Sequence, residues 1–117
     1  MENQHRHIKG YRELSQAEID LMNRIKAKGA ELLALHAELA GVLSEEVEYL
    51  KQAAGQSIKR QEVSGCPATI HTGETPECIE YRRFLAAEPL RWAAIGKTDA
   101  QTSIMALARA VAQPEGV

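Results

Sequence analysis

The chain has 117 residues, a formal net charge of −2 and 44% hydrophobic residues, but it contains only one Trp, three Tyr and one Phe. A chain of this length suits one domain, and its abundance of Ala, Leu, Glu, Lys and Gln favours helix over sheet. The charge excludes an overall basic field of the kind that attracts DNA or RNA.

No apolar run approaches the roughly 18 residues that span a bilayer, and residues 1–10 lack the apolar core of a signal peptide. We therefore predict a cytoplasmic protein without a membrane partner or a polymeric nucleic acid partner. Cys66 and Cys78 are expected to be reduced thiols in such a compartment.

Residues 1–14 are polar and basic and have no periodicity. Ser15 and Glu18 then form a capping box, which predicts that a helix begins there. This helix carries apolar or small residues at alternating spacings of three and four: Met22, Ile25, Gly29, Leu32, His36, Leu39 and Leu43. The near-heptad spacing predicts packing against a long partner helix. Gly41 and Ser44 weaken or kink the pattern, which then continues to about residue 62.

Residues 64–76 are rich in Gly, Pro and Thr, and they are compatible with a loop or a short hairpin. Thr75 and Pro76 predict the start of a second helix, which Pro89 ends or bends. A last helical segment covers about 90–112 and stops at Pro114. Thr98 to Gln101 either caps a new helix or lies inside a continuous one. The predicted fold is all-α: a long helical hairpin with an irregular central insert, in a single domain over residues 1–117.

The N-terminal segment gathers cations around an aromatic ring, immediately before a capped helix start. Cations supply charge for phosphate, and an aromatic ring can stack on a base. This pattern predicts a site for a small anion. The alternative is a solvated basic tail. The residues concerned are His5, Arg6, His7, Lys9, Tyr11 and Arg12.

Lys26 lies beside the apolar seam, and Gly29 lies in mid-helix, where a glycine costs roughly 1 kcal/mol relative to Ala. Close approach of a ligand would account for both residues. So would a snorkelling lysine and tight packing of two helices at the glycine.

Gly96, Lys97 and Thr98 resemble the end of a P-loop, but Arg91 stands where that motif needs its first glycine, and no strand precedes it. What remains is a set of polar and cationic side chains along one helical segment near Trp92: Arg91, Lys97, Thr98 and Arg109. If copies of this segment met around a symmetry axis, they would converge on an anion. In a single copy they are ordinary charges on a helix surface.

No enzymatic site is predicted. Cys66, His71 and Cys78 are residue types that bind metals, but their spacing matches no tetrahedral zinc pattern. No Ser, Cys or Thr stands in a recognisable triad setting, and Glu45 and Glu46 read as solvated charge on a helix. We therefore expect no catalytic residue, no metal and no cofactor.

Two blocks at the ends of the chain are similar to a known family. HRHIKGYRELSQAEIDLMNRIKAKGAEL and RWAAIGKTDAQTSIMALARAVAQP resemble the small phage-encoded sponge proteins that counter the bacterial CBASS and Thoeris defences. The blocks cover about half of the chain. The resemblance implies a helical hairpin in a symmetric homo-oligomer, commonly a hexamer, that acts in the infected host. It also implies binding of cyclic nucleotide signals without cleavage.

Carried onto this chain, the resemblance implies that Tyr11 and Lys26 stack on the base and contact the phosphates of a cyclic dinucleotide between two protomers. Lys9, from the N-terminal cationic cluster, is a further candidate ligand-binding residue. Arg91, Lys97, Thr98 and Arg109 would line separate pockets for cyclic trinucleotides where protomers meet.

Residues 42–88 form an insert relative to short family members, as in the longer relatives associated with glycocyclic ADP-ribose. The resemblance to these longer relatives implies that Phe84 stacks on the ligand, and that Arg82 or Arg83 pairs with it. The sequence hypothesis is therefore a sponge for cyclic oligonucleotides, cyclic ADP-ribose isomers or both. The alternatives are a helical oligomer that binds a protein partner and an enzyme that degrades the same signals.

Overall fold

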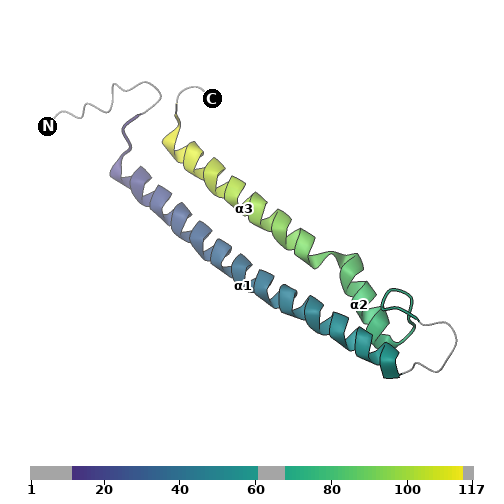
Figure 1. Cartoon of the computed structure of the whole chain (residues 1–117). Helices are drawn as coiled ribbons and strands as arrows, with labels where there is room; N and C mark the ends of the chain where they lie inside the picture. Colours follow the sequence, from purple (N-terminus) through teal and green to yellow (C-terminus); the bar gives the residue numbers. More distant parts are fainter. Residues whose placement is uncertain (1–11, 61–67, 115–117) are drawn as a thin grey trace. The chain divides into compact units, whose positions relative to one another are not determined.

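The computed structural model describes residues 12–60 and 68–114, which form three helices and no strand within these ranges. Helix α1 spans Gln16–Arg60, α2 spans Pro76–Ala87 and α3 spans Pro89–Ala112 (Figure 1). The predicted all-α class is confirmed. Residues 42–60 and 76–87 are helical, so the expected irregular insert is confined, among the described residues, to the turn at 68–75.

Each helix boundary follows from local chemistry. The predicted capping box at the start of α1 is confirmed: the Glu18 amide donates to Ser15 Oγ at 3.2 Å, and the Ser15 amide donates to Glu18 Oε1 at 2.9 Å. Thr75 caps α2 by accepting from the Cys78 amide at 3.1 Å, and Pro76 takes the first helical position. Glu88, in a left-handed conformation with φ 52°, ends α2 directly before Pro89.

The structure is helical at both places where the sequence allowed an interruption of a long helix. Helix α1 passes through Gly41 and Ser44 without interruption, and α3 passes through Gly96, Lys97 and Thr98. The Thr102 hydroxyl donates to the Thr98 carbonyl at 3.0 Å inside α3. The alternative of a new helix cap at Thr98 is therefore wrong, and the reading of one continuous helix is confirmed.

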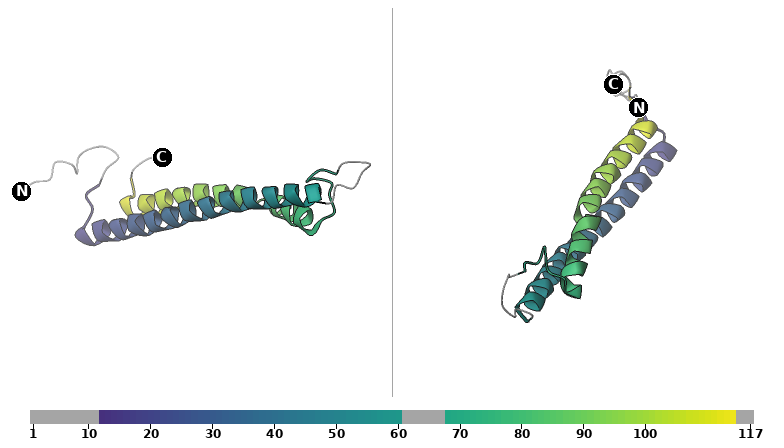
Figure 2. Two further views of the ribbon diagram at one scale, coloured as in Figure 1. Left: turned by 60° about the horizontal axis from the view of Figure 1, so that its bottom comes forward. Right: turned by 90° about the vertical axis from the view of Figure 1, so that its right-hand side faces the viewer.

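The chain packs as two compact units, residues 1–36 with 96–117, and residues 37–95. In the first unit, the beginning of α1 lies beside the end of α3, and the two run in opposite directions (Figure 2). The two helices come close together at Gly29, which is buried against Ile104, while Ala100 is 9% exposed. Sequence reasoning explained Gly29 by the close approach of either a ligand or a second helix. In the structure the close neighbour is helix α3.

The second unit has a small core between the end of α1, the turn at 68–75 and α2. Ala54, Cys78 and Tyr81 are buried, and Val47, Leu50, Ile58 and Ile70 pack against them. Ser57 donates to the Ala54 carbonyl at 2.7 Å, so its single hydroxyl proton is used and Thr75 donates in the 2.7 Å bond between the two hydroxyls. Thr75 thereby joins α1 to the start of α2.

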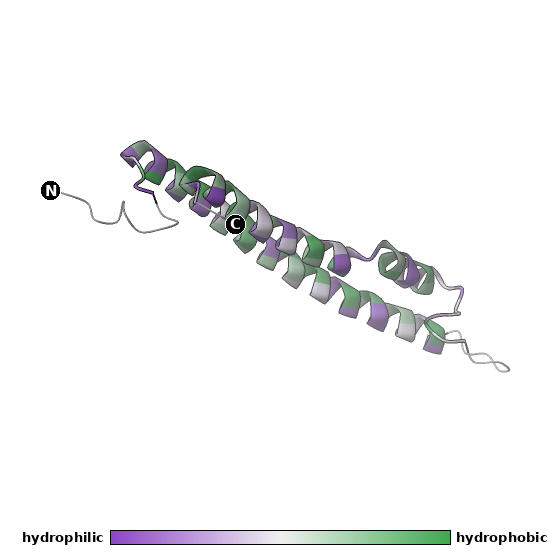
Figure 3. Ribbon diagram, turned by 90° about the horizontal axis from the view of Figure 1, so that it is seen from above, coloured by the Kyte–Doolittle hydropathy of each residue, from purple (hydrophilic) through white to green (hydrophobic). Residues whose placement is uncertain are grey.

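The apolar seam of α1 differs in detail from its prediction. Met22, Ile25, His36 and Leu43 are partly buried as expected, but Leu32 and Leu39 are 51% and 48% exposed. Leu33 and Ala40 are partly buried instead. Figure 3 shows hydrophobic residues interspersed with hydrophilic ones along α1. A single copy therefore leaves apolar side chains of α1 exposed beside the seam.

Candidate functional site

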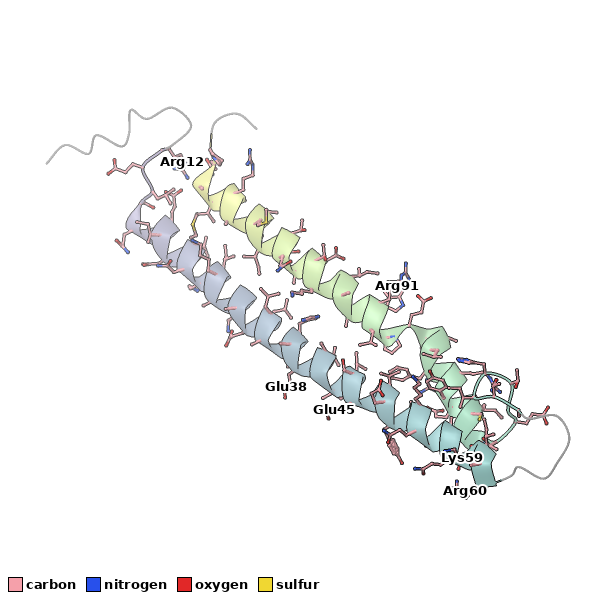
Figure 4. The ribbon with its side chains drawn as sticks, viewed as in Figure 1. Arg12, Glu38, Glu45, Lys59, Arg60 and Arg91 are labelled. Atoms are coloured by element: carbon pink, nitrogen blue, oxygen red, sulfur yellow. The ribbon has the colours of Figure 1, made fainter. Side chains whose placement is uncertain are left out.

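The Arg12 guanidinium forms several hydrogen bonds in the first unit and lies at the end of α3 (Figure 4). Its Nε donates to the Ala112 carbonyl at 3.0 Å, and one terminal nitrogen donates to the Val111 carbonyl at 2.7 Å. The same nitrogen forms an ion pair with Glu18 Oε2 at 2.6 Å. Arg12 therefore joins the first turn of α1 to the last turn of α3.

Glu18 is the anionic partner of this arrangement. The hydrogen bond from Arg12 lowers the pKa of Glu18 to about 2, and the bond from the Ser15 amide contributes to the shift. Glu18 is therefore ionised throughout the physiological pH range. Sequence reasoning identified Arg12 only as a cation for phosphate and Glu18 only as a cap, since spacing along the chain does not reveal carbonyls a hundred residues away.

An apolar groove of about 630 Å³ lies on the first unit, between α1 and α3. Leu21 and Leu107, which are 45% and 53% exposed, belong to its wall. Arg24 and Lys28 supply positive charge at the groove, and Lys28 lies 3.4 Å from Glu31. The lining residues are Leu21, Arg24, Ile25, Ala27, Lys28, Gly29, Glu31, Leu32, Ala100, Ser103, Ile104 and Leu107.

Lys26 is exposed on α1 and is absent from the lining of this groove. With 3.6 residues per turn, it projects about 100° around the helix from Ile25, on the far side of the buried Gly29. Lys26 is therefore available to a ligand or to another protein surface, but not from within the groove. Lys9 and Tyr11, its expected partners in a ligand site, lie outside the described residues, as do His5 and His7.

The cationic set of α3 is distributed over different faces. Lys97, Thr98 and Arg109 are exposed in the first unit. Thr98 and Arg109 are about three turns apart on one face of α3, whereas Lys97 projects about 100° away from Thr98. Nothing in the described part of one chain brings these side chains to a common point. The expectation that they converge depends on neighbouring copies.

Arg91 belongs to the second unit and is already engaged there. It forms an ion pair with Glu88 at 3.0 Å, and its guanidinium lies 5.3 Å from the centre of the Trp92 ring. Figure 4 shows its side chain pointing away from α1, and Trp92 is 59% exposed. An exposed cation on an exposed indole is a surface that a planar ligand or another protein can reach.

The expected stacking role of Phe84 is not supported by this arrangement, because Phe84 is only 3% exposed and its ring is part of the core of the second unit. Arg82 donates to the Ile70 carbonyl at 3.2 Å, and Arg83 is paired with Glu80 at 2.6 Å. The Phe84 side chain, for which the resemblance to longer family members implied stacking, is used here for packing, and both neighbouring arginines have intramolecular partners.

Among residues 12–60 and 68–114, no cluster of three metal-binding side chains occurs. Cys78 is fully buried against Ala54, while Cys66 lies outside these ranges.

In the same described part of the chain, no helix is both long enough and apolar enough to cross a membrane. Figure 4 shows Glu38 and Glu45 on the outer side of α1, where carboxylates are solvated.

Comparison with known proteins supplies the family. The model of the Acb2/Tad1 hairpin domain matches residues 3–112. A curated relative from Pseudomonas phage JBD67, Anti-CBASS protein 2, is 64% identical over 116 residues, which cover 99% of both chains. A match that spans both units and the insert establishes membership, and the chain therefore belongs to the Acb2/Tad1 hairpin-domain family.

Proposed function

We propose that the chain is a phage immune-evasion protein that binds cyclic nucleotide defence signals and sequesters them without cleavage. The observation that carries this proposal is the 64% identity, over almost the whole of both chains, to a relative named Anti-CBASS protein 2. The matched 116 residues include the N-terminal basic segment, both long helices and the insert. The protein would then act in the cytoplasm of the infected host.

The mechanism would be mass action. A tight complex lowers the concentration of free signal below the level that an effector requires, and no bond in the ligand has to break. The exposed cations of the first unit support this reading, because Lys26, Lys97 and Arg109 offer positive charge to a phosphate-bearing ring. Tyr11 and Lys9 would supply the stacking ring and a further cation.

Ligand pockets in this proposal lie between copies of the chain in a symmetric homo-oligomer, which we expect to be a hexamer. The exposed apolar residues beside the seam of α1 and the groove on the first unit support association, since large apolar surfaces on soluble proteins usually mark interfaces. The same observation favours the alternative function, a helical module whose partner is another protein.

The deciding experiment is thermal unfolding of the purified protein with cyclic dinucleotides, cyclic trinucleotides and glycocyclic ADP-ribose, each added separately. Bound ligand is then released by boiling and weighed by mass spectrometry. We expect at least one ligand to raise the melting temperature and to be recovered intact. Recovery of a cleaved ligand would indicate an enzyme, and no shift with any ligand would favour the protein-binding module.

The contribution of single residues is tested with Tyr11→Ala and Lys26→Gln. Both variants should weaken binding of the cyclic dinucleotide while the oligomer keeps its mass in light scattering. Lys59→Gln is the matched control, because Lys59 is an exposed α1 lysine in the other unit. Unchanged affinity in both site variants would remove these two residues from the ligand site.

A further inference from the structure

Helix α1 carries a second apolar stripe, separate from the seam that packs inside the chain. Four large apolar residues of this stripe recur at spacings of three, four and three, and each is between 48% and 61% exposed: Leu32, Leu35, Leu39 and Val42. Each directly precedes a partly buried residue of the seam: Leu33, His36, Ala40 and Leu43. The exposed stripe therefore lies about 100° around the helix from the seam, and it has no cover in a single copy.

The stripe ends in two opposite charges. Continuing the same alternation of spacings leads to Lys28 before Leu32 and to Glu46 after Val42, and both charged residues are exposed. Lys28 lies 3.4 Å from Glu31, but a pair of exposed side chains one helical turn apart contributes little and exchanges easily. An apolar centre with a cation at one end and an anion at the other is complementary to a second copy of itself that runs in the opposite direction.

The spacing of the stripe is symmetric about the level of Ala37. In an antiparallel pair with a two-fold axis at that level, the residues that lie opposite each other are Leu35 and Leu39, Leu32 and Val42, and Lys28 and Glu46. The alternation of three and four residues is the heptad spacing of coiled coils, so these side chains would interdigitate. A parallel pair in register would instead place Lys28 against Lys28 and Glu46 against Glu46, which like-charge repulsion disfavours.

We propose that two copies of the chain associate through this stripe as an antiparallel pair of α1 helices. Lys28 of each copy pairs with Glu46 of the other, and the apolar residues between them form the centre of the contact. Because the axis is two-fold, each copy presents the same surface to the other. The inference assigns one interface to the homo-oligomer of the proposed function, but its test contains no nucleotide, so the two can fail separately.

Cross-linking tests the orientation and the register in the unmodified protein. A carbodiimide reagent joins a lysine amine directly to a carboxylate with which it is in contact. Lys28 and Glu46 are about five turns apart on one helix, or about 27 Å, so this reagent cannot join them within one chain. We expect mass spectrometry to find the peptides of Lys28 and Glu46 joined in the covalent dimer. A protein that self-associates and forms other cross-links without this one would overturn the proposal.

Charge reversal tests the pairing by energy. The variants are Lys28→Glu, Glu46→Lys and the double reversal, and sedimentation equilibrium measures the dissociation constant of the assembly. We expect each single reversal to raise this constant by about tenfold, because it creates two like-charge contacts, and the double reversal to return it to within about threefold of the wild type. Glu48→Lys is the matched control, since Glu48 is exposed about 160° around α1 from Glu46. Single and double reversals of equal effect would overturn the antiparallel pairing.

The apolar centre is tested with Leu35→Gln, which should weaken association by at least about tenfold and leave the helix content in circular dichroism unchanged, because Leu35 is 61% exposed in one copy. Leu107→Gln is the comparison, since Leu107 is an exposed wall residue of the groove on the first unit. Weaker association of the Leu107 variant with no change in the Leu35 variant would place the contact at the groove and overturn the proposal. A monomeric wild type at micromolar concentration would overturn it as well and would leave the stripe to a partner of different sequence.

Discussion

Gly29 shows how a single hydrogen atom in place of a methyl group permits two helices to meet. A Cβ atom at this position would lie 2.4 Å from Cδ1 and 2.6 Å from Cγ1 of Ile104. Ile104 cannot easily rotate away, because β-branched side chains in a helix have essentially one favoured rotamer. The glycine lowers the helix propensity of α1, but it allows α1 and α3 to pack closely in the first unit.

We predict that Gly29→Ala lowers the free energy of unfolding by about 1–3 kcal/mol through overpacking. Gly41→Ala is the matched control on the same helix, since nothing lies within 4 Å of a Cβ atom there. It should stabilise the protein by up to about 1 kcal/mol through helix propensity. Urea unfolding measures both, and Ile104→Ala should make the Gly29→Ala penalty smaller. Equal effects of the two alanines would contradict the close approach.

Glu18 determines a pH dependence at the same end of the first unit. Its pKa in the folded protein is about 2, because Arg12 and the Ser15 amide stabilise the ionised form. A carboxyl group whose pKa is depressed by folding contributes stability above its unfolded pKa, and this contribution is lost as the pH falls toward the folded pKa. We predict that wild-type stability decreases between about pH 4.5 and 2, and that Glu18→Gln is less sensitive in that window. Thermal unfolding across this range measures the difference, and parallel curves for the two proteins would contradict it.

At the scale of helices, Thr75 carries the start of α2. Its hydroxyl accepts from the Cys78 amide and donates to Ser57 on α1, and the residue is 6% exposed. We expect Thr75→Val to lower the free energy of unfolding by about 1–2 kcal/mol, since it removes an N-cap from a buried site. Thr75→Ser keeps the oxygen and should lose much less. Guanidinium unfolding followed by circular dichroism compares the two, and similar losses would show that the methyl group matters as much as the cap.

The helix boundaries were predictable because they depend on neighbouring residues. A serine three residues before a glutamate, a threonine before a proline, and the prolines at 89 and 114 each act within one helical turn. The faces of the helices were less predictable. Leu32 and Leu33 are adjacent and equally hydrophobic, so only the position of the partner helix decides that Leu33 is the more buried.

At the scale of the whole molecule, the proposed ligands are multiply charged anions, whereas the net charge of the chain is −2. Attraction must therefore come from local cations. We predict that affinity for a cyclic dinucleotide falls when ionic strength rises from about 0.1 M to about 1 M, which shortens the Debye length from about 10 to about 3 Å. Titration calorimetry at several NaCl concentrations measures this slope. Affinity that does not depend on salt would indicate a site dominated by stacking instead of exposed cations.

The sequence by itself determined the helical class, the helix boundaries and the family, because caps, periodicity and motifs are local properties of a chain. It also suggested Lys26, Lys97, Thr98 and Arg109 as exposed polar groups, and the structure leaves all four exposed. Only the tertiary structure placed Phe84 in a core, Ile104 against Gly29, and Arg12 on the carbonyls of Val111 and Ala112. The physical reason is that burial and hydrogen-bond partners depend on residues distant in the chain, and no local pattern records which of them a fold brings together.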